Sequence, residues 1–210
     1  MTETLPTVEP EYDVATPLDT DFYLALADVS DAEKDVWRRA RAFALEPDVL
    51  PRIREAWDRH EYPLDLVARL GQADLLRDGV PVDGLPDLSR VAAGLAMMEL
   101  SRLDGSIATM TGVQGGLAMR SIQLCGSEEQ RAEHLPAMAR GELYGAFALT
   151  EPTHGSDSVS LETRAERVDG GWRLHGHKKW IGNGAAGGVT VVWARSCLLY
   201  TSDAADDLLC

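Results

Sequence analysis

The spacing of apolar residues divides the chain into a helical part and a strand-like part. Between Ser30 and Gly141, apolar residues recur at the three-or-four-residue spacing of amphipathic helices. Beyond this point the period shortens to two, most clearly over Thr163–Val168. Helices followed by consecutive strands are typical of an α+β protein and not of an alternating α/β one. We therefore predict an all-helical domain at 30–141 and an antiparallel β domain at 142–195.

Capping residues, prolines and glycines mark the expected helix ends. Ser30–Glu33 and Ser127–Gln130 both have the spacing of a capping box, which begins a helix. Pro51 and Pro63 suit the first turn of two further helices. Gly141 follows the last apolar residue of the helical pattern and is expected to end it.

Two longer helices are expected between Asp87 and Cys125. Each helix is expected to bury one apolar face. In the first helix this face consists of Leu88, Val91, Leu95 and Met98. In the second it consists of Ile107, Met110, Val113, Leu117 and Leu124. The second helix contains Gly115 and Gly116. Adjacent glycines destabilise a helix unless another backbone or a ligand comes close. We therefore expect a close approach at this pair.

The strand-like part begins with an apolar run that ends at Pro152. A hairpin is predicted where Asp169–Gly171 separates two alternating stretches, 163–168 and 172–174. Further strands are predicted at Lys178–Ile181 and Val189–Ala194.

Composition excludes several classes of partner. The formal net charge is -14, with 20 basic residues against 34 acidic ones, which argues against nucleic acid and anionic membranes. No apolar run is long enough to span a bilayer, and nothing resembles a signal peptide. The cysteines, Cys125, Cys197 and Cys210, have no metal-ligand spacing, so we expect a cytoplasmic protein. Residues 1–29 are expected to be an acidic, partly disordered leader.

Three histidines raise the alternative of a metal site. His175 and His177 alternate on a strand, and His154 lies in the preceding loop. No carboxylate or further histidine stands at a supporting spacing. We therefore expect no bound metal.

Two sequence motifs carry the candidate chemistry. Residues 149–157 read L-T-E-P-T-H-G-S-D, and their glycine and hydroxyl groups offer free donors to an anionic or amide-rich ligand. Residues 176–183 read G-H-K-K-W-I-G-N, which places Trp180 beside glycines. In this order and spacing, the motifs resemble the flavin-binding segments of the acyl-CoA dehydrogenase family. Residues 124–131 and 162–165 resemble its glutaryl-CoA dehydrogenase branch, whereas W-I-G-N at 180–183 is similar to short-chain acyl-CoA oxidases.

The resemblance implies FAD-dependent dehydrogenation of an acyl-CoA thioester, with an electron-transfer flavoprotein or dioxygen as acceptor. By position, Phe147, Leu149 and Thr150 are expected along the flavin's pyrimidine edge. Ser156 would contact both the flavin and the pantetheine arm of the substrate. The remaining cofactor-binding candidates are Trp180, Ile181 and Gly182. Ordinary packing in a β core or a turn is the competing interpretation of these residues.

The resemblance also indicates what the chain lacks. The family's catalytic glutamate lies in a C-terminal helical bundle, so no residue here is assigned as the base. We expect the β domain to be incomplete, the chain alone to be inactive, and residues 196–210 to be a tail foreign to the family. A non-catalytic scaffold or binding module is the alternative. The family is usually homotetrameric.

Two departures from the family pattern bear on specificity. Ala108 aligns with the arginine that glutaryl-CoA dehydrogenases use for the distal carboxylate, which favours a neutral acyl chain. Gly182 replaces a threonine that is expected to hydrogen-bond the flavin, and the space it leaves favours access of dioxygen.

Overall fold

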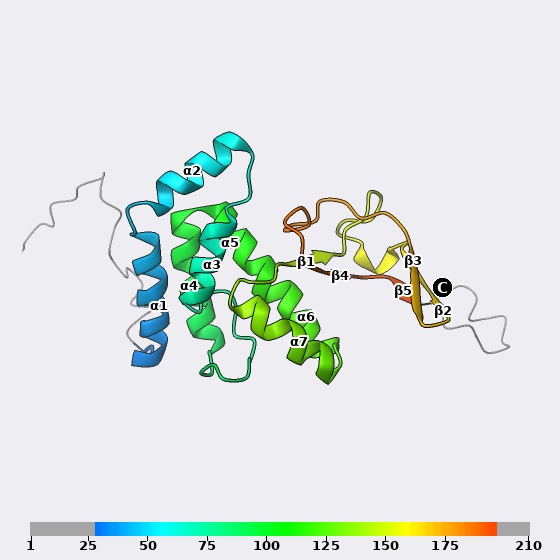
Figure 1. Cartoon of the computed structure of the whole chain (residues 1–210), viewed down its shortest axis with the longest axis horizontal. Coiled ribbons are helices and arrows are strands. Elements are labelled where there is room, and N and C mark those ends of the chain that lie inside the picture. Colours follow the sequence, from blue (N-terminus) through cyan, green and yellow to red (C-terminus); the bar gives the residue numbers. More distant parts are fainter. Residues whose placement is uncertain (1–27, 197–210) are drawn as a thin grey trace, which may run out of the picture. The chain divides into compact units, whose positions relative to one another are not determined.

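The computed structural model describes residues 28–196 (Figure 1). The chain divides into two units at Ser30 and Asp31, and the second contains all the described helices and strands. Most of the leader predicted at 1–29 and of the tail predicted at 196–210, with Cys197 and Cys210, lies outside the described residues.

The first part of the second unit is helical, as predicted. A π-helical segment, η1, joins α5 to α6 without a break in the chain direction. The elements are α1 (Asp31–Ala44), α2 (Val49–Arg59), α3 (Leu64–Gln72), α4 (Arg90–Leu103), α5 (Gly105–Gly112), η1 (Val113–Met119), α6 (Arg120–Cys125) and α7 (Glu128–Ala139). The Ser127–Gln130 capping box is present, with both reciprocal hydrogen bonds. Local capping chemistry therefore located the start of α7 correctly.

The buried face of α4 differs from the prediction. Val91 and Met98 are 52% and 50% exposed, whereas Ala92, Ala96 and Leu100 are buried. Helix α4 packs against α1, and its alanines allow the two helix axes to approach closely. The larger apolar side chains suggested a different face, and small residues at the contact overrode that pattern.

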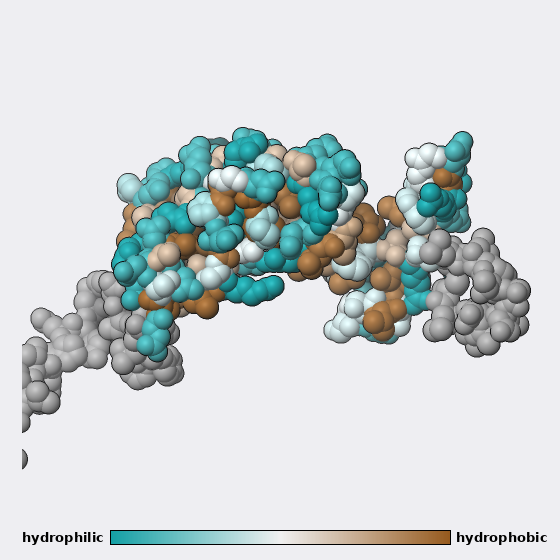
Figure 2. Space-filling view, turned by 90° about the horizontal axis from the view of Figure 1, so that it is seen from below, coloured by the Kyte–Doolittle hydropathy of each residue, from teal (hydrophilic) through white to brown (hydrophobic). Residues whose placement is uncertain are grey.

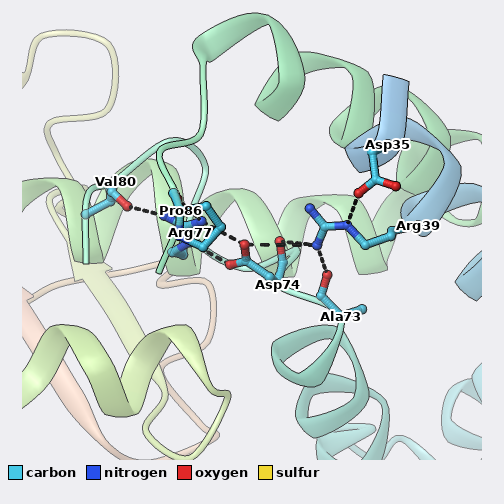
Figure 3. Close-up of polar contacts among 7 residues, drawn as sticks. All are labelled: Asp35, Arg39, Ala73, Asp74, Arg77, Val80 and Pro86. Atoms are coloured by element: carbon cyan, nitrogen blue, oxygen red, sulfur yellow. Dashed lines mark hydrogen bonds and ion pairs between the residues drawn. The ribbon is translucent and has the colours of Figure 1, made fainter. Parts of the chain in front are cut away.

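The Gly115–Gly116 pair meets another segment of backbone, as expected. A Cβ on Gly115 would lie 2.3 Å from the carbonyl oxygen of Leu76. The loop that carries Leu76 is held by the buried guanidinium of Arg77, which is 1% exposed. Arg77 pairs with the carboxylate of Asp74 and donates to the carbonyl oxygens of Val80 and Pro86 (Figure 3). The glycine therefore gives room to a loop whose course is fixed by a buried charge.

The strands form two small sheets with mixed pairing. In one sheet β1 (Gly145–Ala148) pairs in parallel with β4 (Val189–Val192). In the other, β2 (Arg164–Val168) pairs antiparallel with β3 (Gly171–His175) through the predicted hairpin, and in parallel with β5 (Arg195–Ser196). The α+β class is confirmed, and antiparallel pairing holds for the β2–β3 hairpin.

The strand predicted at Lys178–Ile181 is absent. Trp180 and Asn183 have positive φ angles of 60° and 62°, which a strand does not accommodate. In this segment the Lys179 N–H donates to the Thr150 carbonyl, and the Ile181 carbonyl accepts from the Gly184 N–H where the chain turns. Side-chain contacts of Asn183, described below, hold this turn.

Two apolar clusters form the core of the second unit. The first lies among α1–α5 and includes Phe43, Leu70 and Leu100. The second centres on Met119 and Met138, with the β4 side chains Val189 and Val191 packed against it. Other apolar residues stay exposed, among them Leu45, Trp57 and Leu124, and Figure 2 shows apolar patches among the hydrophilic surface. No helix in the range 28–196 is long and apolar enough to cross a membrane.

Buried amide side chains join the helices to β1. The Gln114 side chain, from η1, donates to the carbonyls of Met138 and Leu143 and accepts from the Gly145 N–H at 2.7 Å. The Asn183 side chain donates to the carbonyls of Met110 and Gly145, each at 3.1 Å, and accepts from the hydroxyl of Tyr62. The N–H of Gly145, the first residue of β1, is therefore bound by a side chain of η1, and its carbonyl by a side chain that also contacts α5.

The Leu76 contact predicts different outcomes for the two glycines of η1. Gly115→Ala forces Cβ against backbone and is expected to lower the free energy of unfolding by about 2 kcal/mol. Gly116→Ala meets only the Asp78 carboxylate, at 2.8 Å, which can move. Because alanine favours the helix, this control is expected to stay within about 1 kcal/mol of wild type. Urea unfolding followed by circular dichroism measures both, and equal losses would contradict the close approach.

Candidate functional site

The fold brings the two sequence motifs side by side. Leu149 and Thr150 follow the end of β1, and the second motif returns past them. The Lys179 N–H donates to the Thr150 carbonyl at 2.9 Å, and the Lys178 ammonium donates to the Leu149 carbonyl at 2.9 Å. Residues almost thirty positions apart thus share one site.

Thr150 presents unused donors at this site. Its carbonyl is bound by Lys179, but among the described residues neither its N–H nor its hydroxyl has a hydrogen-bond partner. The residue is half-buried. A polar group in such a position is satisfied by water or by a ligand. This pair of free donors fits a ligand that carries amide-like acceptors.

Trp180, which follows the Lys179 that binds Thr150, offers a large flat surface. Its side chain is 81% exposed, and the Lys179 ammonium lies 4.6 Å from the ring centroid. The left-handed backbone of Trp180 is uncommon for a bulky residue and needs support from its surroundings. That support comes from the buried Asn183, three residues further on. An exposed aromatic ring suits a flat heterocycle such as the flavin ring.

The other predicted site residues have no hydrogen bond that joins the two motifs in the part of the chain that the structure describes. Phe147 is half-buried and packs edge-on against Trp193, with ring centroids 5.8 Å apart. This contact matches the core-packing interpretation of Phe147. Ile181 is half-buried, and a Cβ on Gly182 would lie 3.1 Å from Val113 Cγ2. Ser156 is exposed, and no contact among the described residues joins it to Thr150 or Trp180.

A buried ion pair beneath the site was missed from the sequence. Glu151 is 5% exposed and accepts from the Lys178 ammonium at 2.8 Å, from the Glu162 N–H at 2.5 Å and from the Thr163 N–H at 2.8 Å. Burial opposes ionisation of Glu151, but these hydrogen bonds and that of the Thr163 hydroxyl outweigh it, so the pKa of the carboxyl lies well below its usual range. The sequence feature that could have indicated this ion pair is a glutamate soon after an apolar strand, together with a lysine in the second motif.

The histidines do not form a metal site in the described part of the chain. His154 contacts Glu162 at 3.1 Å and His175 contacts Glu166 at 3.5 Å, which are separate pairs. No group of three potential ligands is found between residues 28 and 196. His175 and His177 instead line an open cavity of about 580 Å³ near Arg164.

The Glu151 environment predicts a pH-dependent stability. Its folded-state pKa lies below the unfolded value of about 4.3, so ionised Glu151 stabilises the folded chain above that pH. Glu151→Gln leaves the Lys178 ammonium without its counter-charge, and the cost near neutral pH is on the order of 3 kcal/mol. As the pH falls below about 4 toward the folded-state pKa, wild type loses this advantage and the difference shrinks.

Urea unfolding of both proteins between about pH 7 and pH 3 measures this difference. Glu133→Gln, at an exposed glutamate of α7, is the matched control and should unfold like wild type at every pH. A gap between Glu151→Gln and wild type that stays constant across the range would contradict the stabilising role of the ionised carboxylate.

Comparison with known proteins shows the family of the chain. Residues 30–142 match the acyl-CoA dehydrogenase N-terminal domain and residues 146–207 match the acyl-CoA dehydrogenase middle domain. The second match includes part of the segment 196–210 that we expected to be foreign to the family. Mitochondrial isovaleryl-CoA dehydrogenase of Solanum tuberosum is 33% identical over 79% of this chain and 41% of its own length.

Solved structures give the same result. Glutaryl-CoA dehydrogenase from Mycobacterium smegmatis is 39% identical with a TM-score of 0.76, over 82% of this chain and 45% of that one. Acyl-CoA dehydrogenase complexed with FAD from Bacillus anthracis is 34% identical with a TM-score of 0.74, over 81% of this chain and 30% of that one. The chain thus spans less than half the length of these relatives. It belongs to the acyl-CoA dehydrogenase family.

Proposed function

We propose that this chain supplies the helical and flavin-contacting parts of an FAD-dependent enzyme that introduces a double bond between the α and β carbons of an acyl-CoA thioester. The observation that carries the proposal is the hydrogen bond from the Lys179 N–H to the Thr150 carbonyl, which joins a residue with free donors to the residue that precedes the exposed Trp180. FAD supplies the hydride acceptor when bound, and the protein contributes binding, orientation and exclusion of water.

Each site residue has a role in this proposal. Thr150 donates hydrogen bonds to the pyrimidine edge of the flavin through its N–H or hydroxyl, and Phe147 and Leu149 border that edge. Trp180 and Ile181 would flank the ring, and Gly182 would offer its backbone N–H as a donor. Ser156 lies in an exposed loop, where it is accessible to the pantetheine arm of the substrate.

The general base is not assigned to any residue of this chain. We propose that it is a glutamate in the part of the relatives' length that the chain does not span, so the chain alone has no turnover. A non-catalytic scaffold is the alternative, and the free donors of Thr150 and the exposed ring of Trp180 favour the flavin-binding function over it. The whole protein is proposed to be a homotetramer.

The electron acceptor is an electron-transfer flavoprotein or dioxygen. Gly182 does not open a space on the side of Val113, because a Cβ there would lie 3.1 Å from Val113 Cγ2, closer than an ordinary van der Waals contact. A threonine would therefore require Val113 to shift, and it would add a hydroxyl donor that Gly182 lacks. The missing donor, together with the W-I-G-N sequence at 180–183, makes acyl-CoA oxidase the second candidate function.

Flavin binding to the chain itself tests the proposal. Because the chain spans less than half the length of its relatives, binding is expected to be weak, and ¹⁵N–¹H NMR titration with FAD detects it. We expect shifts at the Thr150 amide and the Trp180 indole. Trp180→Ala is expected to weaken binding about fivefold, the effect of losing about 1 kcal/mol of ring contact.

Trp57→Ala is the matched control, since Trp57 is also an exposed tryptophan, at 75%, but lies on α2. It should bind FAD like wild type. The proposal is wrong if Trp57 rather than Trp180 responds to FAD, or if saturating FAD shifts neither Thr150 nor Trp180.

The acyl chain of the substrate is proposed to be short or branched, and neutral. Ala108 is 6% exposed and belongs to the apolar cluster that also contains Ile107 and Met110. A distal carboxylate placed there without a cation would lose several kcal/mol. Similarity to glutaryl-CoA dehydrogenases therefore does not extend to their acidic substrate.

Turnover by the whole protein checks this. The value of kcat/KM for butyryl-CoA is expected to exceed that for glutaryl-CoA by at least about 100-fold, which corresponds to about 3 kcal/mol. Formation of crotonyl-CoA from glutaryl-CoA at a comparable rate would contradict the assignment.

A further inference from the structure

Lys178, a residue of the second motif, contacts the first motif, and the proposed flavin contacts give it no role. Its side chain is 11% exposed, and its ammonium donates to the Leu149 carbonyl at 2.9 Å and to Glu151 Oε1 at 2.8 Å. A lysine this far buried pays for desolvation, and the carboxylate partner offsets the cost. The second contact, to a backbone carbonyl, therefore needs a separate explanation.

The carbonyl that Lys178 binds belongs to the same peptide group as the free N–H of Thr150. In a trans peptide the C=O and N–H bonds lie in one plane and point in opposite directions. By binding the Leu149 oxygen, Lys178 fixes the direction in which the Thr150 N–H points. A cation on the oxygen also polarises the group and strengthens its N–H as a donor.

The next peptide group is fixed as well. The Thr150 carbonyl accepts from the Lys179 N–H at 2.9 Å, and the Glu151 N–H donates to the His154 carbonyl at 3.0 Å. Of the backbone polar groups in these two peptide groups, the Thr150 N–H is the one without a partner among the described residues. The arrangement holds one donor ready in a defined direction.

Glu151 holds Lys178 in place. Its carboxylate also accepts from the Glu162 and Thr163 N–H groups, so both oxygens are fixed by the chain that leads into β2. The ammonium therefore has one geometry in which both of its contacts are satisfied. A lysine without this partner would have several rotamers and would point its charge to solvent.

We propose that Lys178 is a positioning residue for flavin binding: its ammonium orients and polarises the Leu149–Thr150 peptide so that the Thr150 N–H donates to a pyrimidine carbonyl of the flavin. This rests on the proposed flavin function of Thr150. Lys178 acts through the peptide and does not touch the ligand.

The test compares Lys178→Met, the double variant Glu151→Gln/Lys178→Met and Lys178→Arg with wild type. The double variant removes both charges, so no unpaired buried ion is left to unfold the chain. Lys34→Met, on α1, is the matched control. The readouts are the ¹⁵N–¹H shift of the Thr150 amide without ligand, and the FAD dissociation constant from NMR titration.

We expect the Thr150 amide signal to move upfield in the double variant, with most other amides unchanged, and the FAD dissociation constant to rise about tenfold. Lys178→Arg should restore part of both, and Lys34→Met should change neither. The proposal is overturned if the double variant keeps the wild-type Thr150 shift, or if it binds FAD within twofold of wild type.

Failure of the flavin function itself has a different signature. If wild type gives no Thr150 or Trp180 shift with saturating FAD, the proposed function is wrong. The ligand-free spectra then test only the effect of Lys178 on the peptide: a displaced Thr150 amide in the double variant supports that effect, and an unchanged one overturns it.

Discussion

The position of Gly145 determines where the rest of the β part lies. Its N–H is bound by the Gln114 side chain at 2.7 Å and its carbonyl by the Asn183 side chain at 3.1 Å. A Cβ at this residue would lie 2.4 Å from Met138 Cε and 2.6 Å from Ala118 Cβ, so the strand begins pressed against the helices. Because these amides are buried, losing one would leave polar groups unsatisfied. The path of β1 to Thr150 follows from this start.

Much of the helical part could be predicted because its signals are local. Capping at Ser127–Gln130 depends on neighbouring residues, and the glycine at position 115 of a helical pattern indicated a close approach without identifying its partner, Leu76. The buried face of α4 could not be predicted, because alanines at the α1 contact decide it and apolar size misleads. The parallel pairing of β1 with β4 and the turn at Trp180 likewise depend on partners distant in the sequence.

In the candidate site, too, some residues could be noticed from the sequence and others could not. The motifs of Thr150 and Trp180 were singled out from the sequence, and the structure joins the two motifs through the Lys179 N–H and the Thr150 carbonyl. Glu151, Lys178 and Asn183 were not identified as contributors, although they stand in the same motifs. Their role is to satisfy one another's buried polar groups, and this becomes visible only when the two segments lie side by side. Spacing in the sequence contains no information about that contact.

Hydrogen bonds and an ion pair, and not apolar packing, stabilise this site, and there is a physical reason for this. A surface that receives a flat ring must stay open, and Trp180 at 81% exposure shows that little apolar burial is available to hold it. Apolar packing is also non-directional, so it does not fix which way a peptide N–H points. Hydrogen bonds and an ion pair do fix direction, at the cost of burying charge. The pairing of Lys178 with Glu151 offsets that cost beneath the site and leaves its outer face free.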